Sequence, residues 1–158
     1  MGSFCRKRQV NMDFRRLRSW SRKLGRRGEN AAAALLKSEG FSILTRNCRI
    51  GNAGELDIVA RDGMTIVFVE VKTRYCKSPD FIPAPVDNLK LHQIKRIRRG
   101  AAAYMRALED PPFKIRFDLI EVLAGRFFIR SLNHRKAFIP ARDLRKTGRE
   151  FPCPPKFC

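Results

Sequence analysis

The chain has 158 residues and a formal net charge of +19 at pH 7, with 34 Lys and Arg residues against 15 Asp and Glu. Hydrophobic residues make up 44% of it, which excludes disorder throughout and leaves room for one domain with a sizeable core. Such a positive charge indicates a polyanionic partner, with nucleic acid the first candidate and an anionic membrane surface the second. The alternative is a basic protein whose charge serves only solubility.

Targeting and redox signals in the sequence are weak. No apolar run approaches the roughly 20 residues that span a bilayer, and the N-terminal residues lack the apolar core of a secretory signal. The five cysteines are odd in number and scattered, which is typical of a reducing compartment. We therefore expect a cytoplasmic protein without transmembrane segments. The cysteines and the two histidines show no spacing typical of a zinc site.

The elements predicted along the chain alternate between helix and strand. A basic extension covers residues 1–23. It is followed by a helix over 24–38 that stops before Gly40, a strand over 41–50, a hairpin over 55–72, a loop over 74–86, a helix over 87–108, and strands over 114–123 and 126–132. A basic tail containing prolines covers 133–158. We expect one α/β domain over 24–132, with a mixed β-sheet of about five strands flanked by helices.

The hairpin over residues 55–72 holds charged residues inside two strongly apolar strands. Taking Asp62 and Gly63 as the two loop residues predicts the cross-strand pairs Arg61–Met64, Val59–Ile66, Asp57–Phe68 and Glu55–Glu70. Because side chains alternate with period two, one face then carries Glu55, Asp57, Glu70 and Lys72, and the other carries Leu56, Ile58, Ala60, Val67, Val69 and Val71.

This register makes Asp57 and Glu70 diagonal neighbours, roughly 7–8 Å apart between Cα atoms. Two carboxylates at that separation could share a metal ion, with Lys72 at the rim of the site. The alternative is a solvated strand end on the polar side of a sheet, where charged residues have only a structural role.

Glu29 is a third candidate carboxylate, on the first helix. It shares a helix face with Ala32, Ala33 and Leu36, so it is predicted to point inward and to need a partner. The alternative is that Glu29 lies in the first turn of its helix, where the macrodipole favours an acid.

The second helix carries cations around an apolar stripe and could lay them along a phosphate backbone. The candidate nucleic-acid-binding residues are Lys90, Gln93, Lys95, Arg96 and Arg99. Gln93 could reach a metal-bound water or a phosphate, or it could be a boundary residue. A solvated helix face is the alternative for the whole set.

The ordered set Glu29, Asp57 and Glu70-Val71-Lys72 resembles the PD-(D/E)xK nuclease superfamily, and its layout is most similar to archaeal-type Holliday junction resolvases. More closely, the chain resembles the YraN family of bacterial nuclease-like proteins from about residue 24 to 122. The matching stretches are 25–32, 40–41, Asn47, 54–60 and 67–74. Leu56 stands where the superfamily has the proline of its name. The resemblance implies a restriction-endonuclease-like fold.

The resemblance also implies a Mg²⁺- or Mn²⁺-dependent endonuclease that acts on nucleic acid, with DNA and its branched forms as expected substrates. Asp57, Glu70 and the carbonyl of Val71 would hold the ion, and Glu29 would complete its shell directly or through water. Lys72 would orient or activate the attacking water and stabilise the developing charge, and Glu55 would support the ligands. A homodimer is implied by the resolvases, which act as dimers.

The rival hypothesis is a non-enzymatic nucleic-acid-binding protein on the same fold. Residues competent for catalysis at all four signature positions (Glu29, Asp57, Glu70 and Lys72) favour the enzyme, because a degenerate binder would be expected to lose at least one of them.

Overall fold

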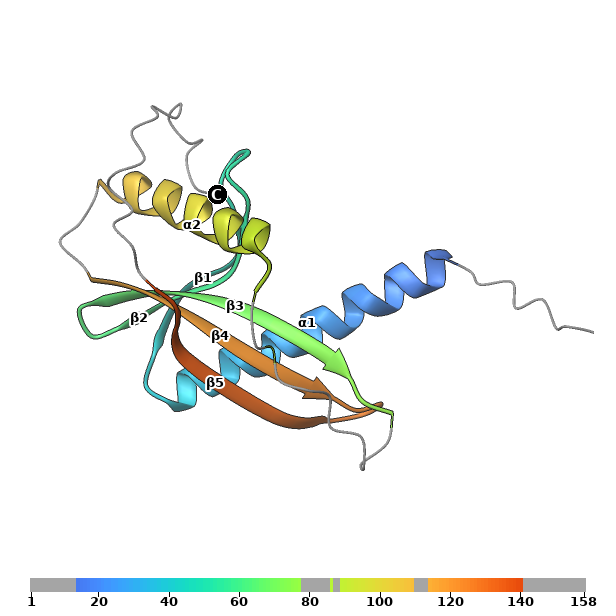
Figure 1. Ribbon diagram of the computed structural model, residues 1–158. Coiled ribbons are helices and arrows are strands. Elements are labelled where there is room, and N and C mark those ends of the chain that lie inside the picture. Colours follow the sequence, from blue (N-terminus) through green and yellow to red (C-terminus); the bar gives the residue numbers. More distant parts are fainter. Residues whose placement is uncertain (1–13, 78–85, 87–88, 110–113, 141–158) are drawn as a thin grey trace, which may run out of the picture.

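The computed structural model describes residues 14–77, 86, 89–109 and 114–140, and its elements are shown in Figure 1. The helices are α1 (Phe14–Ser38) and α2 (Leu91–Ala107). The strands are β1 (Ser42–Arg49), β2 (Glu55–Asp62), β3 (Thr65–Tyr75), β4 (Lys114–Ala124) and β5 (Ile129–Ile139). They form one sheet in the order β1-β2-β3-β4-β5, in which β3 and β4 are parallel and the other neighbours antiparallel.

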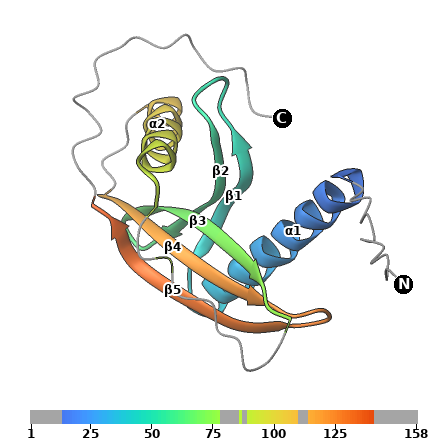
Figure 2. The ribbon, with the colours of Figure 1, turned by 45° about the vertical axis from the view of Figure 1, so that its right-hand side comes forward.

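The two helices cover opposite faces of the sheet (Figures 1 and 2). On one face, α2 packs through Ile97, Ala101 and Tyr104 into a cluster with Phe68 and Phe117. Helix α1 covers the other face. Its residues Ala32, Ala33 and Leu36 pack against four residues of the sheet: Ile58, Val67, Val69 and Ile120. The expected α/β fold with a five-stranded mixed sheet is therefore confirmed, and it is consistent with a restriction-endonuclease-like fold.

The central strand pair explains why β3 reads as an almost continuous apolar run. Strand β3 pairs with β4 from Thr65↔Lys114 to Tyr75↔Ala124, and α2 provides the crossover between them. A parallel pair covered on both faces must be apolar on both faces, which accounts for the buried run from Ile66 to Val69. A charged residue on such a strand, such as Glu70, is therefore buried between the sheet and the helices that cover it.

Helix α1 ends as the sequence predicts. Gly40 adopts φ +86°, its N–H donates to the carbonyl of Lys37, and the N–H of Phe41 donates to the carbonyl of Leu36 at 2.9 Å. This is the Schellman arrangement, which favours glycine because the left-handed conformation is strained for other residues.

Two elements are longer than the sequence analysis predicts. Helix α1 begins at Phe14 rather than near residue 24, and its N-terminal part is anchored by an edge-on contact between Trp20 and Tyr75, with ring centroids 5.1 Å apart. Strand β5 continues to Ile139, because residues 133–139 still pair with β4. Both elements therefore cross the limits expected for the domain. The tail beyond residue 140 lies outside the described residues.

The described helices do not include one that is long and apolar enough to cross a membrane. Most of the loop expected over residues 74–86 lies outside the described residues, although β3 extends through Tyr75 into its predicted start.

Candidate active site

The register of the β2–β3 hairpin differs by two residues from the predicted one. Asp62 pairs with Thr65, so Gly63 and Met64 form the turn, and the ladder continues to Ile58↔Val69. Gly63 adopts φ +55°, a conformation that favours glycine. All four predicted cross-strand pairs are therefore wrong, including Asp57–Phe68 and Glu55–Glu70. A shift of two residues preserves the alternation of faces along the regular ladder, and beyond its end Asp57 and Glu70 still lie close enough for their charges to interact.

Beyond Ile58↔Val69, the hairpin departs from regular pairing, and the candidate site lies at this point. Asp57 and Glu70 are the next residues on the two strands. The backbone N–H of Val71 donates to Asp57 Oδ2 at 2.8 Å, so a side chain takes the place of a backbone acceptor. The divergence of β2 from β3 thus brings two carboxylates to the same place at the edge of the paired region.

The β1–β2 ribbon is distorted at the same level. Asn47 of β1 has φ +50°, between the pairs Arg46↔Ile58 and Cys48↔Leu56. On the far side of this distortion, Leu56 joins the cluster under α2 instead of the α1-facing cluster that holds Ile58. The predicted common face of Leu56 and Ile58 is therefore wrong. The bend carries the end of the ribbon toward α2 (Figure 2).

Glu70 is the most enclosed of the candidate residues, with 4% of its surface exposed. Its Oε1 lies 2.6 Å from Nζ of Lys72 and 3.5 Å from a guanidinium nitrogen of Arg96. A buried carboxylate is costly unless cations or hydrogen bonds compensate it, and here two side chains supply positive charge. The Glu-x-Lys spacing predicted the contact with Lys72, because residues two apart on a strand share a face.

The contact of Arg96 with Glu70 gives this arginine a role that the sequence analysis missed. Arg96 was predicted only as one of several phosphate-binding cations on the second helix. The structure places it against the candidate site, and Gly54 makes room for it: a Cβ on Gly54 would lie 2.9 Å from Arg96 Cγ. Gly54 also adopts φ +131°. A glycine ending the turn before the hairpin was the only sequence signal for this approach.

Asp57 has an unusual protonation equilibrium. Its pKa is raised to about 7, chiefly by burial and then by the negative charges of Glu70 and, more weakly, Glu29, while the N–H of Val71 and the charge of Lys72 oppose the rise. A carboxylic acid that shares a buried position with other carboxylates is a common feature of functional sites. A cation that replaced the proton would relieve the repulsion between these groups.

Glu29 lies well inside α1, which excludes the alternative that it only caps a helix start. Its Oε2 is buried and has no hydrogen-bond partner among the described residues. The helix approaches β3 closely here, because a Cβ on neighbouring Gly28 would overlap Thr73 Oγ1 at 1.8 Å. A buried oxygen without a partner is costly in an apolar setting, and it marks a position that could accept a cation or a bound water.

Two predicted residues are engaged elsewhere. Glu55 pairs with exposed Arg49 at 3.4 Å at the outer end of the β1–β2 ribbon, and no described contact joins Glu55 to Asp57 or Glu70. The side-chain oxygen of Gln93 accepts the backbone N–H of Lys90 at 3.1 Å, which stabilises the start of α2. Both residues therefore have structural partners of their own.

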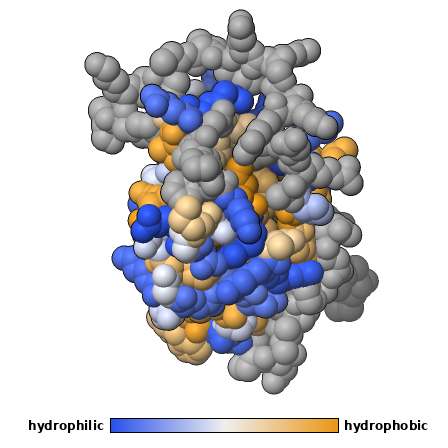
Figure 3. All heavy atoms as spheres, turned by 90° about the vertical axis from the view of Figure 1, so that its left-hand side faces the viewer, coloured by the Kyte–Doolittle hydropathy of each residue, from blue (hydrophilic) through white to orange (hydrophobic). Residues whose placement is uncertain are grey.

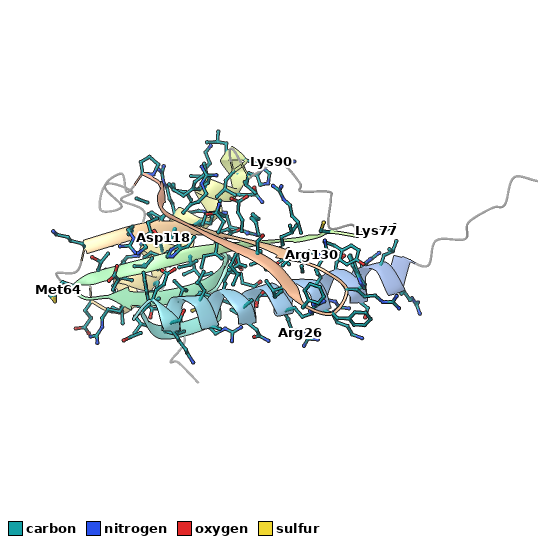
Figure 4. The ribbon with its side chains drawn as sticks, turned by 90° about the horizontal axis from the view of Figure 1, so that it is seen from below. Arg26, Met64, Lys77, Lys90, Asp118 and Arg130 are labelled. Carbon is teal, nitrogen blue, oxygen red and sulfur yellow. The ribbon has the colours of Figure 1, made fainter. Side chains whose placement is uncertain are left out.

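The remaining basic candidates lie on the exposed side of α2. Lys90, Lys95 and Arg99 are all exposed, as a phosphate-binding role requires. Figure 4 shows Lys90 on the same side of the sheet as α2, away from α1. Val71 contributes its N–H to Asp57, a contact that the sequence did not indicate.

The donor set fits a hard divalent cation that is only partly held by protein. Among the described residues, no three acidic, histidine or cysteine side chains converge as a complete metal site. Mg²⁺ usually retains several waters and binds through one or two carboxylates plus substrate phosphate. Asp57 and Glu70 match that pattern, and the unpartnered Oε2 of Glu29 adds a further oxygen nearby.

A second buried polar cluster lies outside the candidate site. Asp118 of β4 accepts hydrogen bonds from Arg116 at 2.9 Å and from the N–H of Ala137 at 2.8 Å, and it contacts His134 Nε2 at 3.0 Å. The other ring nitrogen of His134 lies 2.8 Å from Glu39. The cluster joins β4 to β5 and to the end of α1, and the sequence analysis missed it because residues 133–139 were assigned to a tail.

The sequence matches known proteins over most of its length. Residues 28–122 match the family model described as "Uncharacterised protein family UPF0102". The chain is 40% identical to a UPF0102 protein of Chlorobaculum parvum, over 76% of this chain and 95% of the relative. It is 42% identical to a UPF0102 protein of Bacteroides thetaiotaomicron, over 74% of this chain and 93% of the relative. These matches confirm the resemblance to the YraN-like family, and the chain belongs to the UPF0102 family.

Proposed function

We propose that this chain is a Mg²⁺- or Mn²⁺-dependent endonuclease of the PD-(D/E)xK type, which hydrolyses phosphodiester bonds in nucleic acid, with DNA the expected substrate. The observation that carries the proposal is the meeting of Asp57 and Glu70 where β2 and β3 diverge, beside Lys72. The pKa of Asp57 is raised by burial and by its carboxylate neighbours, so a bound cation could replace the proton that Asp57 otherwise retains.

The position of each residue suggests its role in the proposed reaction. Asp57 and Glu70 would hold the ion, with Glu29 and the carbonyl of Val71 as additional oxygens. When bound, a divalent ion supplies Lewis acidity and lowers the pKa of a bound water. Lys72 would orient the attacking water and stabilise negative charge that develops on the phosphate oxygens. Exposed Lys90, Lys95 and Arg99 would contact the phosphate backbone, which positions the substrate without reading its sequence.

A cleavage assay tests the proposal. End-labelled branched, duplex and single-stranded DNA, together with RNA of the same sequences, is incubated with the protein in Mg²⁺, Mn²⁺ or EDTA. We expect cleavage only with metal, and its loss in Asp57→Asn and Glu70→Gln. Asp62→Asn, at the other end of β2, is the matched control and should cleave normally. Activity that survives Asp57→Asn would show that the site assignment is wrong.

One observation favours the rival function, a nucleic-acid-binding protein without catalysis. Lys72 and Arg96 already compensate the charge of Glu70, so this carboxylate does not require a metal ion. Calorimetric titration with Mn²⁺ separates the two functions. Binding that disappears in Glu70→Gln supports the nuclease, whereas no binding to the wild type, together with intact DNA binding, supports the rival.

A further inference from the structure

A cluster of aromatic rings and arginines lies at the end of the sheet where β3 finishes and the β4–β5 turn begins. We call it the aromatic end, and it consists of Trp20, Tyr75, Arg126, Phe127, Phe128 and Arg130. Three contacts join its parts: the Trp20–Tyr75 ring pair, the Tyr75↔Ala124 strand pair, and a bond from the Arg130 guanidinium to the sulfur of Cys76 at 3.8 Å.

The two phenylalanines of this turn are exposed to an unusual degree. Phe127 is 80% exposed and Phe128 is 63% exposed, although they are adjacent and both apolar. The guanidinium of Arg126 lies 5.2 Å from the centre of the Phe127 ring, and that of Arg130 lies 6.0 Å from the centre of Phe128. Exposed rings rimmed by cations are typical of an interaction surface rather than of an ordinary solvated turn.

The turn that presents these rings is held in one conformation. The N–H of Gly125 donates to the carbonyl of Phe128 at 2.9 Å, and Arg27 of α1 donates to the carbonyls of Gly125 and Arg126 at 3.3 and 3.2 Å. The side chain of Arg130 crosses so close to Gly125 that a Cβ there would lie 3.0 Å from its Nε. A turn whose backbone is held loses less conformational freedom on binding than a mobile one, so the backbone that presents the rings is preorganised.

Charge identifies the partner as an anion. The three segments that meet here, residues 14–27, 73–77 and 123–130, contain Arg and Lys but no Asp or Glu. Figure 4 shows Arg26, Lys77 and Arg130 toward this end of the molecule, and Met64 of the β2–β3 turn at the opposite end. The opposite end has mixed charges, as in the Arg116–Asp62 pair, and hydrophilic side chains form a band across it (Figure 3).

The aromatic end adjoins the candidate active site along both α1 and β3. Tyr75 follows Lys72 by three residues of strand, a distance of about 10 Å, and points to the opposite face, which α1 covers. On α1, Glu29 directly follows Gly28, which contacts Thr73, while Trp20 on the same helix contacts Tyr75. A strand of nucleic acid that joined the candidate site to the aromatic end would therefore have to pass around the end of the sheet.

We propose that the aromatic end binds a single-stranded segment of nucleic acid, whose unpaired bases stack on Phe127 and Phe128 while Arg126 and Arg130 contact its phosphates. The role of this segment as part of the substrate rests on the proposed nuclease function, whereas its binding does not. Flat rings beside guanidinium groups match the stacking surfaces of proteins that bind single strands, and such surfaces tolerate any base sequence. The proposal predicts a preference for substrates with unpaired regions.

Binding without metal tests the proposal independently of catalysis. The full-length protein in EDTA is titrated with fluorescently labelled (dT)20, with a duplex of equal length, and with a (dT)20 analogue that has abasic sites throughout. We expect Phe127→Ser and Phe128→Ser each to weaken binding of (dT)20 by about five-fold or more, with little effect on the duplex or the abasic strand. The salt dependence should not change, because neither variant removes a cation.

Met64→Ser is the matched control, because Met64 is 65% exposed and lies at the opposite end of the sheet. It should bind all three probes as the wild type does. Trp20 is the only tryptophan in the chain and lies in the surface, so its fluorescence should be quenched by (dT)20 and not by the abasic strand.

Two results would overturn the proposal. One is equal binding of (dT)20 and the abasic strand, which would leave only a charge effect. The other is unchanged binding of (dT)20 in both phenylalanine variants. If the same variants then lose binding to phosphatidylglycerol vesicles, the turn belongs to a membrane-binding surface instead. If cleavage fails in every assay while the base-dependent binding remains, the nuclease proposal fails and this one stands.

Discussion

The N–H of Val71 donates to Asp57 Oδ2 at 2.8 Å, across the point where β2 and β3 cease to pair regularly. This bond stabilises the ionised carboxylate, yet burial and the charge of Glu70 outweigh it and leave the pKa of Asp57 raised to about 7. The unfolded chain has no such environment, so the folded state holds this proton more tightly. Ionisation of Asp57 therefore destabilises the fold progressively between about pH 4 and pH 7.

Asp57→Asn should stabilise the metal-free protein, and more so at pH 8 than at pH 5. At about 1.4 kcal/mol per pKa unit, the ionisation that the variant removes costs a few kcal/mol above pH 7. Thermal unfolding in EDTA at the two pH values measures the difference. Asp62→Asn, on the same strand but only partly buried and paired with Arg116, should give no such gain. A variant less stable than the wild type at pH 8 would contradict the prediction.

Removal of Lys72 should destabilise the fold through Glu70. Lys72→Ala leaves a carboxylate that is almost fully buried with only the longer contact to Arg96, and we expect a loss of about 2–3 kcal/mol in the free energy of unfolding. The double variant Lys72→Ala with Glu70→Gln should recover most of this loss, because the unpaired charge is gone. Urea unfolding of the four proteins of this double-mutant cycle gives the coupling energy; additive effects would show that the two side chains do not interact.

Gly28 should not tolerate even alanine. Its substitution places a methyl group 1.8 Å from Thr73 Oγ1, so α1 must move away from β3 or the strand must shift. We expect a loss of about 2 kcal/mol or more in the free energy of unfolding, despite the higher helix propensity of alanine.

Gly25→Ala, one turn earlier on α1, is the control for this prediction. The nearest atom to its added Cβ lies 4.0 Å away, so helix propensity should make this variant as stable as the wild type or slightly more stable. Chemical denaturation of both variants decides the matter, and equal effects would show that the contact with Thr73 is loose.

The buried Asp118 cluster should make stability fall as the pH rises above 6.5. Burial lowers the pKa of His134, but hydrogen bonds to Asp118 and Glu39 overcome this effect and raise it above its ordinary value. The stabilisation from protonated His134 is therefore complete below pH 6.5 and is lost as pH rises through the folded-state pKa. Direct titration of the ring by NMR gives that value.

His134→Gln should reduce the fall in stability above pH 6.5 and leave the change between about pH 4 and pH 6.5 in place, because that change belongs to Asp57. Calorimetry across the pH range separates the two contributions. A profile identical to the wild type above pH 6.5 would show that His134 is not protonated in the fold.

The faces of the regularly paired part of the hairpin could be predicted from sequence, although its register and the face of Leu56 could not. Apolar alternation fixes which residues point to the same side, and it is unaffected by a shift of two residues. The Asp62-Gly63 pair suggested a two-residue turn at those positions, whereas Gly63 and Met64 form it. Sequence alone could not choose between these registers, because both bury the same apolar side chains.

Local sequence patterns could not predict the contacts between segments that are far apart in the chain. Arg96 reaches Glu70 only because α2 crosses the sheet at that level, and nothing in its own helix distinguishes it from Arg99. Likewise, Asp118 is a single acid in an alternating strand, and its partner His134 lies in a stretch whose charged residues suggested a tail. Pairing along β5 is a tertiary effect that overrides such local composition.

The parallel pairing of β3 with β4 has a consequence for how the molecule folds. Every one of its pairs joins residues that are far apart in sequence, and α2 must be traversed before the first can form. The chain loses loop-closure entropy before such contacts provide any stabilisation, so this central pairing is expected to form late and to slow folding. Asp57 and Glu70 can come together in an early hairpin, but Arg96 cannot reach them until the crossover docks. A partly folded chain therefore lacks a complete candidate site, and any chemistry of that site must wait until the sheet has closed.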